Sequence, residues 1–390
     1  MSASLHLDPE PCSMRCLPRL LGLLPLLLAF HCFAQASLPA APVAAPPAVQ
    51  DDGPYVFHVD NHRLEALWVC AGKPVREVLR ERAVTTVAPR CGYPHPLRIP
   101  RTLDADAPAL APGARIIALS DIHGQYGVMQ RLLRANGVID AQDRWAAGHD
   151  HLVIAGDVFD RGPQVTEAFW LLFSLQQQAR AAGGAVHFLL GNHETMALYD
   201  DLRYLNPKYK TIADLLDKAY PALYGADTVL GAWLRSRPVL LKLGDTLFLH
   251  GGIAPENLDL VANMAATNAA YDASLGTPKA QVKADPALNR LYNGKTSPIW
   301  YRGYFNGALT TEQVKALVAQ LGVTRIVVGH TTIGEVASFH DGKVIAIDSG
   351  IKRGKAGQLL FIEGDQLSRG LMDGCRQPLP ALTAVADDPE

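Results

Sequence analysis

Short apolar runs that end abruptly in polar residues recur along the chain from about residue 113. ARIIALS, HLVIA, AVHFLL, TLFL, TRIVV and KVIAI are rich in β-branched residues and predict buried strands. Between them, VMQRLLRANG places apolar residues at helical spacing, and TEAFWLLFSLQQQARAAGG predicts a second helix with Thr166 as a possible N-cap. Strands that alternate with helices predict a layered α/β domain. We place this domain at residues 106–375, followed by a tail at 376–390.

The preceding segment, residues 53–105, has a different pattern. YVFHV and ALWVC predict strands, whereas VREVLRERAV carries both helical and strand signals. We therefore expect a small β-rich extension there. Residues 37–52 contain SLPAAPVAAPPAVQ, a Pro/Ala-rich linker without a core-forming pattern.

The first 36 residues predict a signal peptide. Arg15 and Arg19 precede a leucine-rich stretch, and Ala-Gln-Ala at residues 34–36 fits a cleavage site, with Met14 as a possible true start. The alternative is an uncleaved anchor, although the apolar run is short for a membrane span. We expect a periplasmic or secreted protein without stable membrane insertion after cleavage.

Composition and charge narrow the function classes. The 390 residues are 48% hydrophobic and 19% charged, and the net charge is −2, so no nucleic-acid partner is expected. Cys70, Cys91 and Cys375 remain after the predicted cleavage. In an exported protein Cys70 and Cys91 are the most plausible disulfide pair, and three unpaired thiols are the alternative.

Polar residues with metal-ligand chemistry stand beside glycine at the ends of five predicted strands. They are Asp121 and His123, Asp157, Asn192, His250, and His330. Each motif alone is weak, since a single histidine after a strand is usually structural. Ligand sites in open α/β sheets lie beyond the carboxyl ends of the strands. Five such ends in one chain therefore predict one shared site.

The ligand chemistry indicates the cofactor. Three histidines, two aspartates and one asparagine, without thiolate, suit divalent ions such as Mn, Fe or Zn. An aspartate shared by two ions would place them roughly 3.5–4 Å apart, as in two-metal hydrolytic sites. We expect two divalent ions.

Further residues predict phosphate ester hydrolysis. Within GDVFDRG, Arg161 is suited to bidentate phosphate binding, and Asp160 with His193 would form a general-acid pair. Arg302, in IWYRGYF, would hold the phosphate from another side. The alternatives are a structural Asp160–Arg161 ion pair within the turn and an Arg302 stacked on a neighbouring aromatic ring.

The order DxHG, GDxxDRG, GNHE, HGG, RG, GH resembles that of the calcineurin-like metallophosphoesterases of the PPP phosphoprotein phosphatase branch. SDIHGQYGVMQRLLRANGVID, DLRYLNPKY, WLRSRPVLLKLGDTLFLHGGI and WYRGYF look closer still to the bacterial Shewanella-like protein phosphatases. The resemblance covers roughly residues 113–365. It implies a four-layer sandwich of two mixed β-sheets flanked by helices.

The resemblance also implies residue roles. One metal would be held by Asp121, His123 and Asp157, and the other by Asp157, Asn192, His250 and His330. Asp160 and His193 would be the acid pair, Arg161 and Arg302 the phosphate clamp, and a metal-bridging hydroxide would attack phosphorus in line. Because IDSGIKRGKAGQLLF stands where eukaryotic protein phosphatases have a SAPNY-type loop, their substrate preference is not carried over.

The sequence is compatible with three functions. The first is an exported metal-dependent phosphatase of phosphoproteins carrying phosphoserine, phosphothreonine or phosphotyrosine. The second is a small-molecule phosphoesterase acting on nucleotides or dinucleoside polyphosphates. The third is an inactive scaffold, which loss of His193 or of a metal ligand would signal, and no such loss is seen.

Overall fold

The computed structural model describes residues 51–103, 107 and 109–383. The predicted signal peptide, most of the predicted linker and the end of the predicted tail lie outside the described residues. These residues belong to the compact unit that begins at residue 49.

A six-stranded mixed sheet carries the first three predicted strand-end motifs. Its order is β16-β15-β14-β6-β7-β8, in which β6, β7 and β8 run parallel and β14, β15 and β16 pair antiparallel. Its strands are β6 (Ile116–Leu119), β7 (His151–Ile154), β8 (Ala185–Phe188), β14 (Leu359–Glu363), β15 (Gln366–Gly370) and β16 (Arg376–Pro378). The stretch expected as a tail thus begins with an edge strand.

A five-stranded mixed sheet carries the other two motifs. Its order is β12-β13-β11-β10-β9, with β10, β11 and β13 parallel. Its strands are β9 (Leu241–Leu243), β10 (Thr246–Leu249), β11 (Arg325–Val328), β12 (Ala337–Phe339) and β13 (Val344–Ala346).

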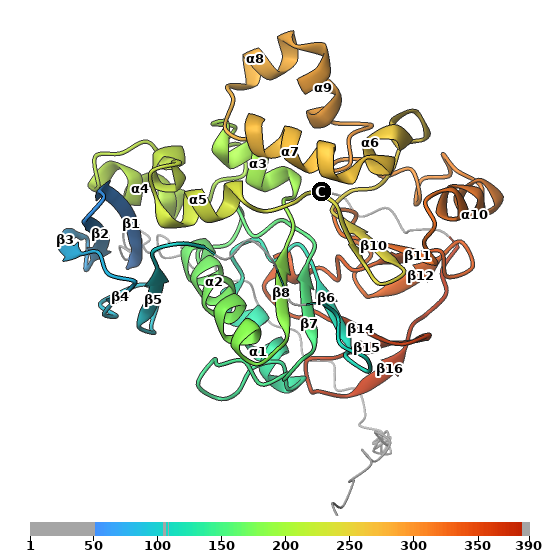
Figure 1. Ribbon diagram of the computed structural model, residues 1–390, viewed down its shortest axis with the longest axis horizontal. Helices are drawn as coiled ribbons and strands as arrows, with labels where there is room; N and C mark the ends of the chain where they lie inside the picture. Colours follow the sequence, from blue (N-terminus) through green and yellow to red (C-terminus); the bar gives the residue numbers. More distant parts are fainter. Residues whose placement is uncertain (1–50, 104–106, 108, 384–390) are drawn as a thin grey trace, which may run out of the picture. The chain divides into compact units, whose positions relative to one another are not determined.

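The two sheets pack on each other through a cluster of apolar side chains that is distinct from the larger hydrophobic core. Ala118 and Val153 of the first sheet and Phe248, Val327 and Ile345 of the second belong to it, and all are fully buried. These strands are buried at every position and are mostly apolar because both of their faces are covered. Helices cover the outer faces, with α1 and α2 beside β6–β8 and α10 beside β11 and β12 (Figure 1). The predicted four-layer α/β class is confirmed.

The helices have the following bounds: α1 (Tyr126–Ala135), α2 (Val165–Ala181), α3 (Asn192–Leu198), α4 (Pro207–Leu215), α5 (Val229–Arg235), α6 (Leu258–Ala262), α7 (Met264–Ser274), α8 (Lys279–Ala284), α9 (Pro286–Tyr292) and α10 (Thr311–Gln320). The expected N-cap of α2 is wrong. Gln164 occupies that position, and the Thr166 hydroxyl lies within hydrogen-bond distance of Asp52, Tyr55 and Tyr224 instead. No helix in the described ranges combines the length and apolarity that a membrane span needs.

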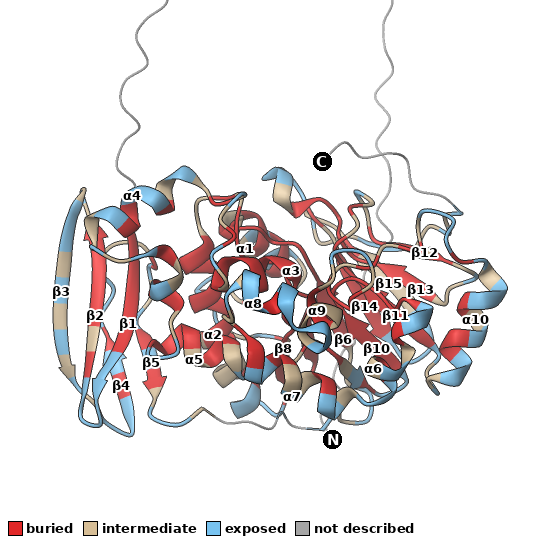
Figure 2. Cartoon of the chain, turned by 90° about the horizontal axis from the view of Figure 1, so that it is seen from above, coloured by how far each residue is buried: buried red, intermediate tan, exposed pale blue. Residues whose placement is uncertain are grey.

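A three-stranded antiparallel sheet forms the N-terminal extension. It consists of β1 (Asp52–Asp60), β2 (Arg63–Cys70) and β3 (Lys73–Arg80), and a hairpin of β4 (Val84–Val87) and β5 (Leu97–Pro100) follows. The ambiguous run VREVLRERAV is largely β3, whose alternating burial is that of an outer strand (Figure 2). Cys70 and Cys91 form a disulfide, the pairing that the sequence favoured.

Candidate active site

The polar residues predicted from strand ends converge where the two sheets meet. Asp121, Asp157 and Asn192 follow the parallel strands β6, β7 and β8, and His250 and His330 follow the parallel strands β10 and β11. The carboxyl ends of parallel strands share one edge of a sheet, so each sheet presents its motifs together. All six predicted metal ligands are buried.

Asp157 lies at the centre of this arrangement. Its Oδ1 accepts the backbone N–H of His193 at 2.9 Å. Its Oδ2 faces the Nε2 atoms of His250 at 3.1 Å, His123 at 3.7 Å and His193 at 3.9 Å. Two groups of potential ligand atoms therefore share Asp157: one includes His123 and His193, the other His250 and His330.

Backbone carbonyls orient the histidines. His123 Nδ1 donates to Phe159 O at 2.7 Å and His250 Nδ1 donates to Ala155 O at 2.6 Å, so the Nε2 lone pair of each ring points to the centre. Such outer hydrogen bonds fix the tautomer of a metal-binding imidazole. In His330, Nε2 lies 3.1 Å from Trp300 O, which leaves Nδ1 for a ligand.

Two oxygen donors complete the set. Asn192 Oδ1 lies 2.9 Å from His250 Nε2. Asp121 Oδ2 accepts the N–H of His330 at 2.9 Å, and Asp121 Oδ1 lies 3.9 Å from His123 Nε2. The six predicted ligands are thus brought together. The ligand atoms that lie within 4.8 Å of one another around His123 are those of Asp157 and His193, whereas the resemblance implied Asp121 at this position.

The ligand histidines differ in protonation behaviour. Burial lowers the pKa of His250, but Asp157 and Asp121 outweigh this effect and raise it to about 9. Burial lowers the pKa of His123 and His330 well below the ordinary value, which keeps both imidazoles neutral and able to coordinate. Burial, with Asp348 as a neighbour, raises the pKa of Asp121 to about 8. Carboxylates as crowded as Asp121 and Asp157 cannot both ionise cheaply unless a cation compensates them. Oxygen and imidazole donors without thiolate match Mn, Fe or Zn.

The backbone at the site is held in an uncommon conformation. Asp121, His123, Asp157, Asp160, Arg161 and His330 all have positive φ, between 46° and 71°. Non-glycine residues seldom adopt this region, and such strain concentrates at functional sites. Gly191 permits the close approach, because a Cβ atom there would collide with Asp157 Oδ1.

Asp160 pairs with His193. His193 Nδ1 lies 2.6 Å from Asp160 Oδ2, and both side chains are buried. Burial lowers the pKa of His193, but Asp157 and Asp160 outweigh this effect and raise the pKa above its ordinary value. The second ring nitrogen faces the centre of the site, 3.9 Å from Asp157. The imidazolium is therefore stabilised and oriented, as a general acid requires.

Two arginines border the centre on different sides. The Arg161 guanidinium lies 4.9 Å from the ring centroid of Tyr204, and its buried Nε has no hydrogen-bond partner among the described residues. Arg302 Nη1 donates to the carbonyl of His330 at 2.7 Å. Arg161 is close enough to lower the pKa of His123, and Arg302 to lower that of His330.

Two residues at the site were given no role from the sequence. Glu194 accepts the N–H groups of Asp157, Val158 and Gly191 at 2.8 Å and that of Phe159 at 3.2 Å. The GNHE motif contained this signal. Tyr204 lies in DLRYLNPKY, and its ring centroid is 5.2 Å from that of His193.

The sequence profile of the calcineurin-like phosphoesterases matches residues 114–333. The chain belongs to the calcineurin-like phosphoesterase family. This family is metal-dependent, and the resemblance predicted from the motifs is confirmed. As a calcineurin-like phosphoesterase, the protein is a phosphoester hydrolase.

Individual relatives of this phosphoesterase are phosphatases. Shewanella-like protein phosphatase 2 of Arabidopsis thaliana is 27% identical over 289 residues, which cover 62% of this chain and 72% of the relative. The crystal structure of a cold-active protein-tyrosine phosphatase of a psychrophilic Shewanella sp. is similar at 40% identity, with a TM-score of 0.78, and covers 85% of this chain and 99% of that one. A symmetrical bis(5'-nucleosyl)-tetraphosphatase of Methylococcus capsulatus is 33% identical over 141 residues, 36% of this chain and 44% of that relative.

Proposed function

We propose that the protein is an exported phosphatase that uses two divalent metal ions to hydrolyse phosphomonoesters of phosphoproteins. The observation that carries the proposal is Asp157 Oδ2, which faces three imidazole nitrogens and belongs to both groups of potential ligands. A shared aspartate of this kind is the mark of a two-metal hydrolytic site.

The ligand set divides between two ions. Asp121, His123 and Asp157 would hold one ion, and Asp157, Asn192, His250 and His330 would hold the other. When bound, divalent ions lower the pKa of water and neutralise charge on the phosphoryl group.

The arginines would bind the phosphoryl oxygens. Guanidinium groups donate two parallel hydrogen bonds to phosphate, which lysine cannot do. The Nε–H of Arg161, which has no partner among the described residues, is available as such a donor. The Tyr204 ring packs against the guanidinium and orients it. Arg302, held by the His330 carbonyl, would bind from the other side of the centre.

His193 would protonate the leaving oxygen of the ester. Asp160 holds the ring through Nδ1, so Nε2 carries the proton that faces the site. Burial lowers the pKa of His193, but Asp157 and Asp160 outweigh this effect and raise it, which favours the protonated ring.

Phosphotyrosine is the substrate class that we place first, with phosphoserine and phosphothreonine next. The structural relative at 40% identity is named a protein-tyrosine phosphatase, and its similarity extends over nearly its whole length. The partly buried Tyr204 ring beside His193 and Arg161 would contact an aromatic leaving group.

Dinucleoside polyphosphates are the second candidate. Relatives with that activity in their name match the chain over only about a third of its length. The half-buried Trp300, whose ring centroid lies 5.4 Å from that of His330, could stack on a base.

The test is a metal-reconstitution assay. The chain from Ser37 would be stripped of metal and given Mn, Fe, Zn or Mg, then assayed with phosphotyrosine, phosphoserine and phosphothreonine peptides and with diadenosine tetraphosphate. We expect peptide turnover that needs metal and is lost in Asp157→Asn. Turnover restricted to diadenosine tetraphosphate would establish the second candidate, and no turnover despite bound metal would refute the enzymatic proposal.

A further inference from the structure

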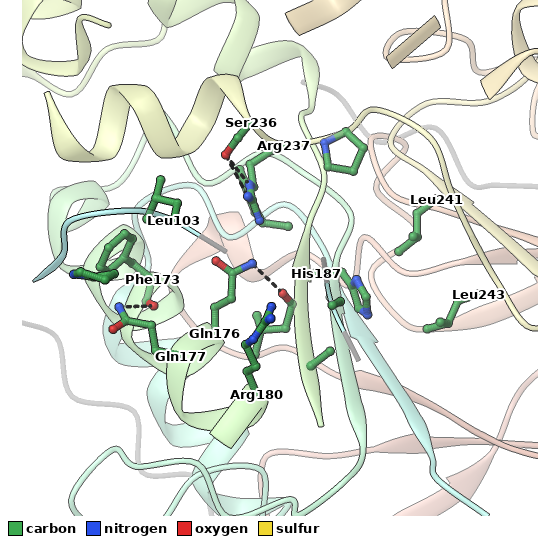
Figure 3. Close-up of a pocket in the computed structure, with 16 residues that line it drawn as sticks. Leu103, Phe173, Gln176, Gln177, Arg180, His187, Ser236, Arg237, Leu241 and Leu243 are labelled. Carbon is green, nitrogen blue, oxygen red and sulfur yellow. Dashed lines mark hydrogen bonds between the residues drawn. The ribbon is translucent and has the colours of Figure 1, made fainter. Parts of the chain in front are cut away.

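A cavity of 510 Å³ lies away from the metal ligands, between α2, the edge strand β8, the residues that follow α5, and β9 (Figure 3). None of the residues assigned to metals, acid or phosphate lines it. Its volume falls within the range of small-molecule sites, roughly 300–1,000 Å³. Phosphate ester hydrolysis gives this cavity no role.

Most of the wall is apolar. Phe173 of α2, Phe188 of β8, and Leu241 and Leu243 of β9 contribute side chains from three elements. Gln176, which also lines the cavity, uses its amide to bind Val186 O and its oxygen to accept from Trp233 Nε1. The amide of Gln176 is therefore part of the wall rather than a free polar group.

One buried cation lines this cavity. Arg237 is 8% exposed, and no carboxylate among the described residues forms an ion pair with it. Its Nε donates to Trp233 O at 3.2 Å and its Nη2 donates to Ser236 Oγ at 2.8 Å, whereas its Nη1 has no acceptor within the described chain. Burial lowers the pKa of Arg237 to about 10, which reflects the missing counter-charge.

The remaining polar groups indicate a singly charged ligand. His187 Nε2 lies 3.0 Å from His151 Nδ1, and burial with His151 and Arg237 nearby lowers the pKa of His187 to about 3, so this imidazole is neutral. Arg180 also lines the cavity but is exposed at the protein surface, whereas Arg237 is buried. One desolvated guanidinium matches one negative charge, and a dianion would bring an uncompensated charge into an apolar wall.

We propose that this cavity binds a small amphipathic carboxylate, whose anionic group pairs with Arg237 and whose apolar body contacts Phe173, Leu241 and Leu243. Guanidinium pairs with carboxylate through charge-assisted hydrogen bonds, and the free Nη1 supplies a donor. The apolar wall accounts for the rest of the ligand. Since β8 leads directly to Asn192 and His193, an occupant would contact the strand that positions them.

The test compares matched probes by isothermal titration calorimetry. The purified protein, treated with chelator so that no carboxylate can bind a metal, is titrated with 4-phenylbutyrate, with the uncharged 4-phenylbutanol and with inorganic phosphate. We expect one equivalent of 4-phenylbutyrate to bind, with affinity at least about tenfold above that of the other two probes. Equal affinity for the alcohol, stronger binding of phosphate, or no binding of 4-phenylbutyrate would overturn the proposal.

Variants place the ligand in the cavity. Arg237→Met keeps the apolar stem and should lower the affinity for 4-phenylbutyrate about tenfold or more, and Arg237→Lys should lower it less. Arg302→Met, the matched change at the phosphate-binding centre, should leave the affinity for 4-phenylbutyrate unchanged. If Arg302→Met lowers this affinity and Arg237→Met does not, the carboxylate binds in the active site and the proposal is wrong. If Arg237→Met fails to fold, Leu241→Trp fills the cavity with Arg237 intact and should abolish binding, and retained binding would refute the assignment.

Discussion

A single buried carboxylate, that of Glu194, holds the loop that presents Asp157. It accepts four backbone N–H groups, three of them from Asp157, Val158 and Phe159. In Glu194→Gln, an NH₂ group replaces one carboxylate oxygen and faces backbone N–H groups, from which it cannot accept hydrogen bonds. Each buried N–H left without an acceptor costs about 1–3 kcal/mol. We expect metal affinity to fall by about 10–100-fold, measured by calorimetric metal titration. The exposed Glu256→Gln is the control, and equal affinities in the two variants would contradict this role.

The Asp160–His193 pair predicts a dependence on the leaving group. His193→Ala should lower kcat for a phosphoserine peptide by about 10²–10⁴-fold, because an alkoxide needs a proton as it departs. The loss on p-nitrophenyl phosphate should be much smaller, since nitrophenolate leaves without protonation. Asp160→Asn should follow the same pattern more weakly. Steady-state kinetics with both substrates checks this, and equal losses would mean that His193 acts through metal binding instead.

At the level of secondary structure, the sequence predicted those strands and helices whose local pattern of apolar and polar residues is distinctive. The runs that became β6, β7, β8, β10 and β11 are mostly apolar because both faces of each sheet are covered, and the polar residues that follow them mark the site. VREVLRERAV stayed ambiguous because β3 is an outer strand with polar residues on one face. The role of Tyr204 depends on its contact with Arg161, 43 positions earlier in the chain, which no local pattern records.

A buried charge cluster joins the N-terminal sheet to the catalytic layers. Lys208 Nζ of α4 lies 3.0 Å from Asp52 of β1 and 3.7 Å from Glu167 of α2, and it donates to Pro163 O at 2.7 Å, just after GDVFDRG. Burial and Asp52 raise the pKa of Glu167 from 4.5 to about 7, although Lys208 opposes the shift. Glu167 is thus protonated in the folded protein at pH values where the unfolded chain has already released that proton.

This linkage predicts a pH-dependent effect of Glu167→Gln. A raised carboxyl pKa contributes stability that is complete below pH 4.5 and is lost as pH rises through about 7. The glutamine variant lacks this loss. The difference in free energy of unfolding, variant minus wild type, should therefore increase by up to about 3 kcal/mol between pH 5 and pH 8. Urea unfolding at several pH values measures the difference. A difference independent of pH, as expected for the exposed Glu312→Gln, would show that Glu167 is ionised throughout.

For the molecule as a whole, the disulfide stabilises a small sheet that lies outside the two-sheet core. Cys70 and Cys91 are 21 residues apart, and closing a loop of this length stabilises the folded state by about 3 kcal/mol. We expect the Cys70→Ser, Cys91→Ser double variant to lose about 2–4 kcal/mol in urea unfolding while kcat stays near wild type, because neither residue lines the site. Wild type in reductant should lose at least as much stability as the variant. An unchanged midpoint under reduction would show that the crosslink contributes nothing.

The disulfide and the first 36 residues make one joint prediction about location. Disulfides persist in oxidising compartments, and Arg15 and Arg19, the leucine-rich stretch and Ala-Gln-Ala at residues 34–36 are typical of a cleaved export signal. In a bacterial host, the full chain should yield a periplasmic protein that begins at Ser37, with Cys70 and Cys91 oxidised, as measured by fractionation and intact mass. A chain lacking residues 1–36 should stay in the cytoplasm with both thiols reduced. Ala36→Arg should block cleavage and leave a longer, membrane-associated form. If wild type itself shows that longer mass in the membrane fraction, the segment is an anchor, and the phosphatase would act at the membrane surface rather than free in the periplasm.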